Sequence, residues 1–331
     1  MAEVIRPNKL ANFIGNTAVK KQLEIILEST RETNQVFPHS IFYGFAGTGK
    51  TTLAKIISNE TGCPVTTITG NSIRKQRDLL FLLWDIHDKA IDAGKPAILF
   101  IDEIHSLASG SGELDLSIWL PIIEEYTFYN NMKGEQVDYD GRKLEITSND
   151  IHFPPFTIIG ATTDIADLND AFRRRFPVQC FMQSYTVEEL TQIVQLHAEK
   201  RQIKITASAS LNIARRSRFN PSVSVSLLEN CRYYQTARKF QEMNDTVVNE
   251  EMGMIGVDTS GLRYEDTRIL ETLAETEKGM GISNLAGSSG ISKDVIEKIV
   301  EPFLKQMGFM KVTTRRFITD KGWEYLTKEI K

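Results

Sequence analysis

The stretch FYGFAGTGKTTLAKII, residues 42–57, most constrains what this chain can fold into. Its glycine loop, residues 44–51, matches the pattern G-x-x-x-x-G-K-[ST] in full. A short apolar run precedes the loop and apolar residues at helical spacing follow it, which predicts a strand, a loop and a helix in that order. Glycines let backbone N–H groups converge, and a helix N-terminus carries partial positive charge. The pattern therefore predicts a phosphate-binding loop, with a plain glycine-rich turn as the alternative.

Residue types within the loop indicate how a nucleotide would be held. We expect Lys50 to reach the β- and γ-phosphates, and Thr51 to offer its hydroxyl to Mg²⁺. The residues of the loop and of the first helical turn that we predict to contact the nucleotide are Gly44, Gly47, Thr48, Gly49, Lys50, Thr51 and Thr52.

A second motif, AILFIDEIH at residues 97–105, supplies carboxylates. A continuous apolar run that ends in two acids predicts a buried parallel strand with its acids at the ligand-binding edge of the sheet. We expect Asp102 to hold the Mg²⁺ shell and Glu103 to orient or deprotonate the attacking water. An acidic turn after a core strand is the alternative. His105 is either a structural histidine or part of the site.

A third apolar run, residues 156–161, ends in polar residues that could contact the γ-phosphate or the attacking water. The segment 170–176 follows and contains three consecutive arginines, which cannot all share one surface direction. They form either a solvated basic turn or a donor to a neighbouring subunit's phosphate, since arginine stabilises phosphoryl transfer when it is supplied in trans.

Composition limits the class of protein. A chain of 331 residues predicts two or three domains, and 41% apolar with 25% charged residues is typical of a globular protein. No apolar run is long enough to span a bilayer, and the first ten residues lack a signal-peptide pattern, so we expect a cytoplasmic protein without membrane contact. Reduced thiols are expected at Cys63, Cys180 and Cys231. The net charge of −4 means that any nucleic-acid binding must come from a local basic patch.

Taken together, these motifs resemble the RuvB family of AAA+ ATPases, which drive branch migration of Holliday junctions. The resemblance covers almost the whole chain, and its proline-rich third strand and C-terminal residues are more specific than the phosphate loop. The segments that carry it are Ile5-Arg6-Pro7, residues 12–15, 44–51, 100–105, 154–163, 172–176, 214–218, 301–304 and 308–309.

The resemblance implies further site residues. Thr163 would take the sensor 1 position, and Arg175 would be the arginine finger that completes a neighbouring subunit's site. The remaining nucleotide contacts that it implies, around the adenine and toward the lid, are Arg6, Pro7, Phe13, Ile14, Tyr185 and Pro221. It also implies a hexameric ring, and contact with a RuvA-like protein through a hairpin in residues 125–150. A surface hairpin without a partner is the alternative.

The sequence departs from the family pattern at two places. Pro221-Ser222 stands where the family has Pro-Arg in sensor 2, and Arg218 is a candidate substitute whose spacing does not fit a simple swap. Phe45-Ala46 occupies loop positions where the family usually has two prolines. These departures predict a divergent member whose sensing of ATP is altered.

The predicted architecture is an α/β AAA+ P-loop ATPase domain (residues 1–181), a helical lid domain (182–256) and a C-terminal winged-helix domain (257–331). Alternating residues on both sides of Gly134 predict two strands, residues 126–129 and 143–147. Thr186 with Glu189 predicts a capping box that opens a lid helix. In the last domain we expect helices over residues 267–275 and 293–307.

A hairpin whose turn holds residues 313–316 would form the wing of the last domain. Its basic residues Lys311, Arg315 and Arg316 predict contact with DNA phosphates or a minor groove, and a solvated basic turn is the alternative. With the family resemblance, these features predict an ATP-driven, helicase-type motor that acts on Holliday junctions in DNA recombination and repair. The alternatives are a nucleotide-gated loader that binds DNA and hydrolyses ATP slowly, and a remodeller of a protein partner.

Overall fold

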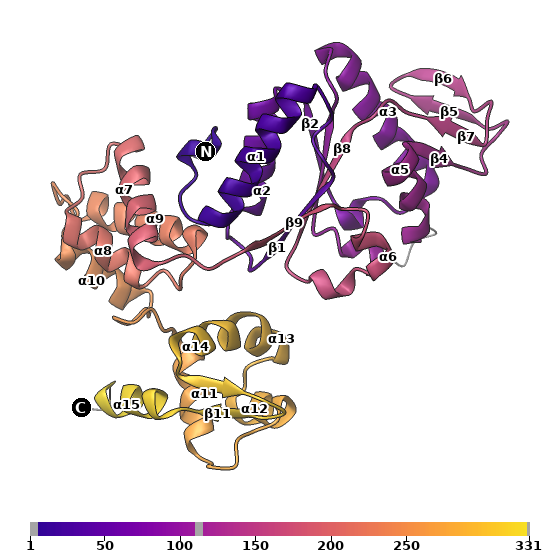
Figure 1. Cartoon of the computed structure of the whole chain (residues 1–331). Coiled ribbons are helices and arrows are strands. Elements are labelled where there is room, and N and C mark those ends of the chain that lie inside the picture. The colour runs from indigo at the N-terminus through magenta and orange to yellow at the C-terminus, as the bar shows by residue number, and fades with distance from the viewer. Residues whose placement is uncertain (1–5, 110–114, 330–331) are drawn as a thin grey trace. The chain divides into compact units, whose positions relative to one another are not determined.

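The computed structural model describes residues 6–109 and 115–329, so Ile5 of the first family-like segment lies outside the described residues. The chain divides into two compact units, Met1–Tyr185 and Thr186–Lys331 (Figure 1). Among the described residues, no helix combines the length and the apolar character that crossing a membrane requires.

The first unit is built on a five-stranded parallel sheet in the order β2-β3-β8-β1-β9. Its strands are β1 (Ser40–Gly44), β2 (Val65–Thr69), β3 (Ile98–Asp102), β8 (Thr157–Thr162) and β9 (Val178–Met182). β8 is buried along its whole length and β3 at every position before Asp102, because helices cover both faces of the sheet. The predicted α/β fold is confirmed.

Two hydrophobic clusters hold helices on opposite faces of this sheet. α1 (Thr17–Thr33) and α2 (Lys50–Thr61) bury residues in one cluster, and α3 (Gln76–Ala93) and α5 (Trp119–Glu125) bury residues in the other. The neighbours Ile41 and Phe42 belong to different clusters, as alternation along a strand requires. The shorter helices of the unit are η1 (Leu10–Asn12), η2 (Gly70–Ser72), α4 (Ser106–Ser109), η3 (Leu116–Ile118), η4 (Ile165–Asp167) and α6 (Asp170–Arg173).

The segment between β3 and β8 pairs differently from the prediction. β4 (Thr127–Tyr129) pairs with β7 (Asp150–His152), while β5 (Gln136–Tyr139) and β6 (Arg142–Glu145) form a separate hairpin. The hairpin turns at Asp140-Gly141, where both residues have positive φ, rather than at Gly134. An Asp-Gly pair is a strong signal for a two-residue hairpin turn, and the sequence prediction missed it.

The second unit begins with a lid of four helices around one core: α7 (Val187–Lys200), α8 (Ala207–Arg215), α9 (Pro221–Ala237) and α10 (Asp245–Met254). The predicted capping box is confirmed. The Thr186 hydroxyl accepts a hydrogen bond from the Glu189 N–H at 3.2 Å, and the Glu189 carboxylate accepts one from the Thr186 N–H at 2.9 Å.

The rest of this unit has the elements of a winged helix: α11 (Tyr264–Ala274), α12 (Ile282–Ser289), α13 (Lys293–Val295), a π-helical turn η5 (Ile296–Val300), α14 (Glu301–Met307), β10 (Met310–Val312), β11 (Arg316–Ile318) and α15 (Asp320–Glu329). The helix expected over 293–307 therefore contains a π-turn. The first helix of this domain begins three residues earlier than expected, at Tyr264. Arg316 lies in strand β11 rather than in the turn of the wing.

Candidate nucleotide site

The glycine loop lies between β1 and α2, at the carboxyl edge of the sheet, where ligands bind in open α/β folds. Gly44 and Gly49 have φ of 135° and 102°, which side chains rarely adopt. A Cβ on Gly44 would lie 2.5 Å from the Met182 carbonyl oxygen, and one on Gly49 would lie 3.0 Å from the Phe13 ring. Both positions therefore require glycine.

Lys50 is buried and points back into the loop. Its Nζ donates hydrogen bonds to the carbonyl oxygens of Gly44 and Phe45, at 2.8 and 2.9 Å. Burial lowers the pKa of the ammonium, while the charges of Glu103 and Asp102 act against that fall. A poorly hydrated cation inside a glycine loop at a helix N-terminus fits a nucleotide's phosphates, because it gains more from an anion than a solvated lysine would.

The acidic pair, Asp102 and Glu103, lies at the carboxyl end of β3, at the same edge of the sheet as the glycine loop. Asp102 ends β3, and Glu103 follows with a positive φ of 49°. The imidazole Nδ1 of His105 lies 2.8 Å from the Thr162 hydroxyl and 3.3 Å from the Glu103 carboxylate. His105 therefore links Glu103 to β8, and its membership of the site stays a prediction.

The two threonines after β8 have different surroundings. Thr162 is fully buried, and besides the contact with His105 its hydroxyl accepts a hydrogen bond from the Asp164 N–H at 3.0 Å. Thr163, the predicted sensor residue, is exposed just beyond the strand. Sequence reasoning overlooked Thr162, since adjacent threonines carry no signal that separates the buried one from the exposed one.

Two aromatic rings close the back of the loop. Phe13 and Tyr185 are almost completely buried, and the Tyr185 hydroxyl donates to the Thr48 carbonyl oxygen at 3.1 Å. A Cβ on Gly15 would lie 2.6 Å from the Tyr185 ring. Ile14, which follows Phe13, is half-buried, and Arg6 is exposed. Pro7 and Thr52 are also half-buried, and Thr51 occupies the first turn of α2.

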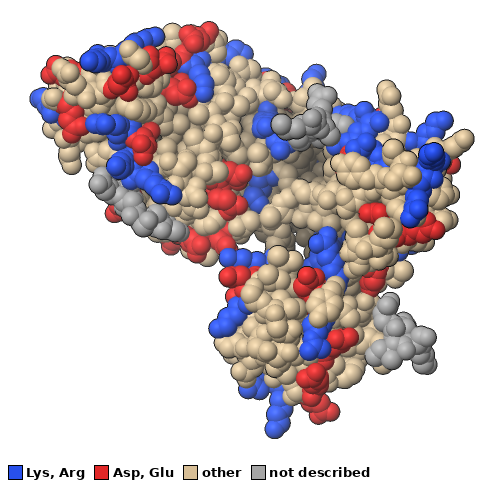
Figure 2. All heavy atoms as spheres, turned by 180° about the vertical axis from the view of Figure 1, so that it is seen from behind, with Lys and Arg blue, Asp and Glu red and all other residues tan. Residues whose placement is uncertain are grey.

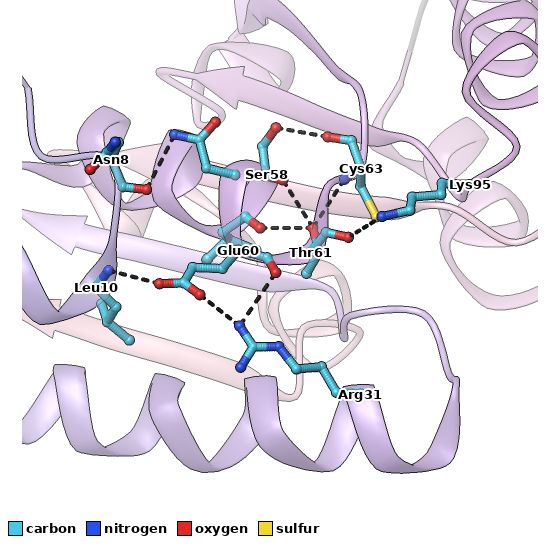
Figure 3. A network of polar contacts seen from close by, with 10 residues as sticks. Asn8, Leu10, Arg31, Ser58, Glu60, Thr61, Cys63 and Lys95 are labelled. Carbon is cyan, nitrogen blue, oxygen red and sulfur yellow. Dashed lines mark hydrogen bonds and ion pairs between the residues drawn. The ribbon is translucent and has the colours of Figure 1, made fainter.

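The segment that carries Phe13 is anchored to the far end of α2, as Figure 3 shows. The Glu60 carboxylate accepts hydrogen bonds from the Leu10 N–H at 3.2 Å and from the Arg31 guanidinium at 2.6 Å. The Asn59 amide donates to the Asn8 carbonyl oxygen at 3.3 Å. These contacts fix the N-terminal segment against the helix that begins at Lys50.

The three consecutive arginines have three environments, as predicted. Arg173 pairs with Asp170, Arg174 is exposed, and the Arg175 Nε lies 2.9 Å from a Glu124 carboxylate oxygen. The contact of Arg175 is an ion pair without hydrogen-bond geometry, so its buried Nε makes no hydrogen bond. Sequence gave no sign of Glu124, which is half exposed on α5.

Pro221 and Ser222 open α9, where the Asn220 side chain caps the helix. Pro221 is the first helical residue, and Ser222 is exposed. The Arg218 guanidinium is ion-paired with Asp266 and lies 3.9 Å over the Phe303 ring. These contacts argue against Arg218 as a substitute for the sensor arginine, in line with its unsuitable spacing in the sequence.

The basic residues of the wing divide into two kinds. Lys311 and Arg315 are exposed, although Arg315 also donates to the Lys278 carbonyl oxygen at 3.1 Å. Arg316 instead pairs with Glu301 at 2.6 Å and with Glu297 at 3.2 Å, which leaves 11% of its side chain exposed. On the face seen in Figure 2, basic and acidic side chains are interspersed, in keeping with the small net charge.

Fold and site together define a P-loop ATPase of the AAA+ class with a helical lid and a winged helix. Three family models match successive parts of the chain: the P-loop domain of the Holliday junction DNA helicase RuvB (residues 5–182), the RuvB AAA lid domain (185–258) and the RuvB C-terminal winged-helix domain (259–327). The chain belongs to the RuvB family.

Relatives are similar over nearly the full chain. Proteins named Holliday junction branch migration complex subunit RuvB are 35% identical in Fervidobacterium nodosum and 34% identical in Streptococcus agalactiae. Each match covers 97% of this chain, and 88% and 92% of the relatives. The solved structure of the Thermotoga maritima RuvB Holliday junction branch migration motor has a TM-score of 0.79 at 31% identity, covering 97% of this chain and 98% of that one.

Proposed function

We propose that this chain is an ATP-driven motor for branch migration of Holliday junctions in DNA recombination and repair. The observation that carries the proposal is that RuvB P-loop, lid and winged-helix models follow one another along a single chain. The proposal keeps the domain limits expected from the sequence, 1–181, 182–256 and 257–331. It assigns ATP hydrolysis to the first domain and DNA contact to the last.

ATP would be held by the glycine loop, and Mg²⁺ by the Thr51 hydroxyl and the Asp102 carboxylate. The buried Lys50 ammonium supports this assignment, because phosphate oxygens can replace the two carbonyl oxygens that it now contacts. Bound Mg²⁺ would neutralise charge on the phosphates. Glu103 would orient the attacking water, with His105 holding its carboxylate toward β8.

Arg175 would act on a neighbouring subunit's nucleotide, so that hydrolysis requires a ring. Its present partner Glu124 offers one half-exposed ion pair, which a more negative phosphate site can outcompete. A hexamer is the oligomer that we propose. The β5–β6 hairpin, whose strand β6 is exposed at all four positions, would contact a RuvA-like partner through residues that include Leu144.

On the winged helix, Lys311 and Arg315 would contact DNA phosphates, because both are exposed on the wing. Arg316 would support the wing from inside the domain through Glu301.

Strand exchange on a synthetic four-way junction tests the proposal, with a RuvA-like protein present and absent. We expect ATP-dependent exchange that Lys50→Ala abolishes, with ATP turnover reduced about 10²- to 10³-fold through loss of a buried donor to the phosphates. Lys55→Ala is the matched control, since Lys55 is exposed on the same helix. Strand exchange that does not depend on ATP, or that survives Lys50→Ala, would refute the motor.

Ser222 favours a second candidate, a nucleotide-gated loader that binds DNA and hydrolyses ATP slowly. Ser222 cannot supply the charge of a sensor arginine, and Arg218 is committed elsewhere. ATP turnover with and without junction DNA separates the two functions. Strong stimulation by the junction supports the motor, and near-zero turnover under both conditions supports the loader.

A further inference from the structure

The segment between α8 and α9 holds an unusual backbone. Arg218 and Phe219 are consecutive residues with side chains, and both have left-handed φ, 52° and 55°. Such a conformation persists only when the surrounding contacts enforce it. The two side chains identify those contacts, because both lie against the winged-helix domain: Arg218 contacts Asp266 and Phe303, and Phe219 contacts Phe303.

The Arg218 guanidinium contacts three elements of the winged helix. It pairs with both oxygens of Asp266 on α11, donates to the Ile299 carbonyl oxygen at 3.0 Å, and stacks over the Phe303 ring of α14. The acceptor at Ile299 belongs to the π-helical turn, a rare element that occurs often at functional sites.

The contacts of Arg218 with Asp266, Ile299 and Phe303 form what we call the joint, and its ion pair is largely buried. The Asp266 side chain is 1% exposed and that of Arg218 10%. Asp266 also accepts a hydrogen bond from the Arg263 N–H at 2.9 Å, so the same carboxylate caps the first helix of the winged helix. Loss of Arg218 would leave a buried charge without its partner, and loss of a single partner from a buried pair is strongly destabilising.

A second set of contacts fixes the segment that connects the two domains. The Arg216 guanidinium donates to the Asp258 carbonyl oxygen at 2.8 Å, and the Asp258 carboxylate accepts a hydrogen bond from Tyr325 on α15 at 2.5 Å. A Cβ on Gly261 would approach the Arg216 backbone to 3.0 Å. Asp258, in the segment that connects the two domains, is therefore held by a residue of the lid and by a residue of the last helix.

We propose that Arg218, through Asp266, fastens the winged helix to the lid, so that any movement of the lid carries the DNA-binding domain with it. Arg218 is then a positioning residue for the transfer of motion to DNA. The consequence for the motor rests on the proposed function, but the fastening itself does not.

The joint is tested by spin-label distances in the full chain. Labels at Ser226→Cys on α9 and Glu324→Cys on α15 report on the two domains, because both positions are exposed. Cys63→Ser removes the half-buried thiol, and the buried Cys180 and Cys231 are protected from labelling. We expect a narrow distance distribution in the parent protein.

The test variant is Arg218→Met with Asp266→Asn, which removes both charges and so avoids an unpaired buried carboxylate. We expect the distance distribution to widen about twofold or more, as for domains joined only by a linker. Junction migration per ATP hydrolysed should fall about tenfold, while ATP turnover stays within about twofold, because the contacts that are removed are with the winged helix.

The matched control is Arg232→Met. Arg232 also combines an ion pair, with Glu229, and stacking, over Tyr233, but all within the lid. An unchanged distance distribution in the double variant would overturn the proposal. So would an Arg232→Met variant that widens the distribution as much as the double variant does. A double variant that loses ATP turnover and junction migration in the same proportion would also overturn it. If the parent protein migrates no junction, the proposed function fails, whereas the distances still decide whether the joint exists.

Discussion

Two arginines of this chain, Arg175 and Arg218, each follow a short helix and each pair with a carboxylate about 50 residues away in sequence. Glu124, the partner of Arg175, is half exposed, and the pair lacks hydrogen-bond geometry. Asp266, the partner of Arg218, is 1% exposed and accepts two hydrogen bonds from the guanidinium. In the proposed ring, the first arginine would leave its partner for another subunit, whereas the second cannot leave without exposing a buried charge.

Replacing Arg175 should give the largest effect. We expect Arg175→Ala to reduce ATP turnover about 10³-fold or more, the usual contribution of an arginine finger supplied in trans. Steady-state ATPase rates at ring-forming protein concentrations measure this.

A mixing experiment provides the control for action in trans. When Arg175→Ala and Lys50→Ala chains are combined in equal amounts, random assembly places an intact Lys50 beside an intact Arg175 at about a quarter of the interfaces. Turnover should recover to about that fraction. If the mixture stays as inactive as its components, Arg175 does not act across an interface.

The second effect in size concerns stability and contrasts the two carboxylates. Asp266→Asn should destabilise the second unit by about 3–5 kcal/mol, because it leaves the buried Arg218 charge without its partner. Glu124→Gln should change the stability of the first unit by less than about 1 kcal/mol, since Glu124 is half exposed and water can solvate its carboxylate. Denaturant titration followed by fluorescence measures both. If both variants lost a similar free energy of unfolding, Arg175 would be held by its carboxylate as firmly as Arg218.

This contrast also shows how much the sequence could predict. The glycine loop, the acidic strand and the positions of Lys50 and Asp102 follow from local patterns, because each role depends on residues within a few positions of one another. Only the family resemblance singled out Arg175 among three consecutive arginines. Tertiary partners have no local signal. Neither Glu124 nor Asp266 stands out among the chain's acids, so the sequence could not show that Arg218 already has a buried partner.

The same reasoning explains the errors within elements. The Asp140-Gly141 dipeptide is itself a signal for a turn, and the sequence prediction overlooked it. The π-turn at Ile296–Val300 has no such signal, because its apolar residues keep the spacing of an ordinary α-helix. The wing was predicted as a hairpin, yet only packing decides that Arg316 turns inward to Glu301 while Arg315 stays exposed.

The wing gives a third prediction, smaller in size. Arg315→Ala should weaken junction binding about three- to tenfold and reduce the slope of log affinity against log salt by about one, without lowering the melting temperature. Arg316→Ala should lower the melting temperature instead, since Glu301 loses its partner. Binding titrations at several salt concentrations, with thermal scans, separate the two. A larger loss of stability for Arg315→Ala than for Arg316→Ala would reverse the assignment.

The smallest effect tests how weakly Arg175 is held. Glu124→Gln removes the charge that keeps Arg175 within its own subunit while preserving the size of the side chain. An exposed ion pair contributes about 0.2–1 kcal/mol, so its removal should raise turnover at limiting protein concentration by about 1.5- to 5-fold. Glu125→Gln is the matched control, because Glu125 is the neighbouring exposed acid at the end of α5. A fall in turnover specific to Glu124→Gln would instead mean that Glu124 orients Arg175 for catalysis, and the exposed pair would then resemble the buried one in being functionally fixed.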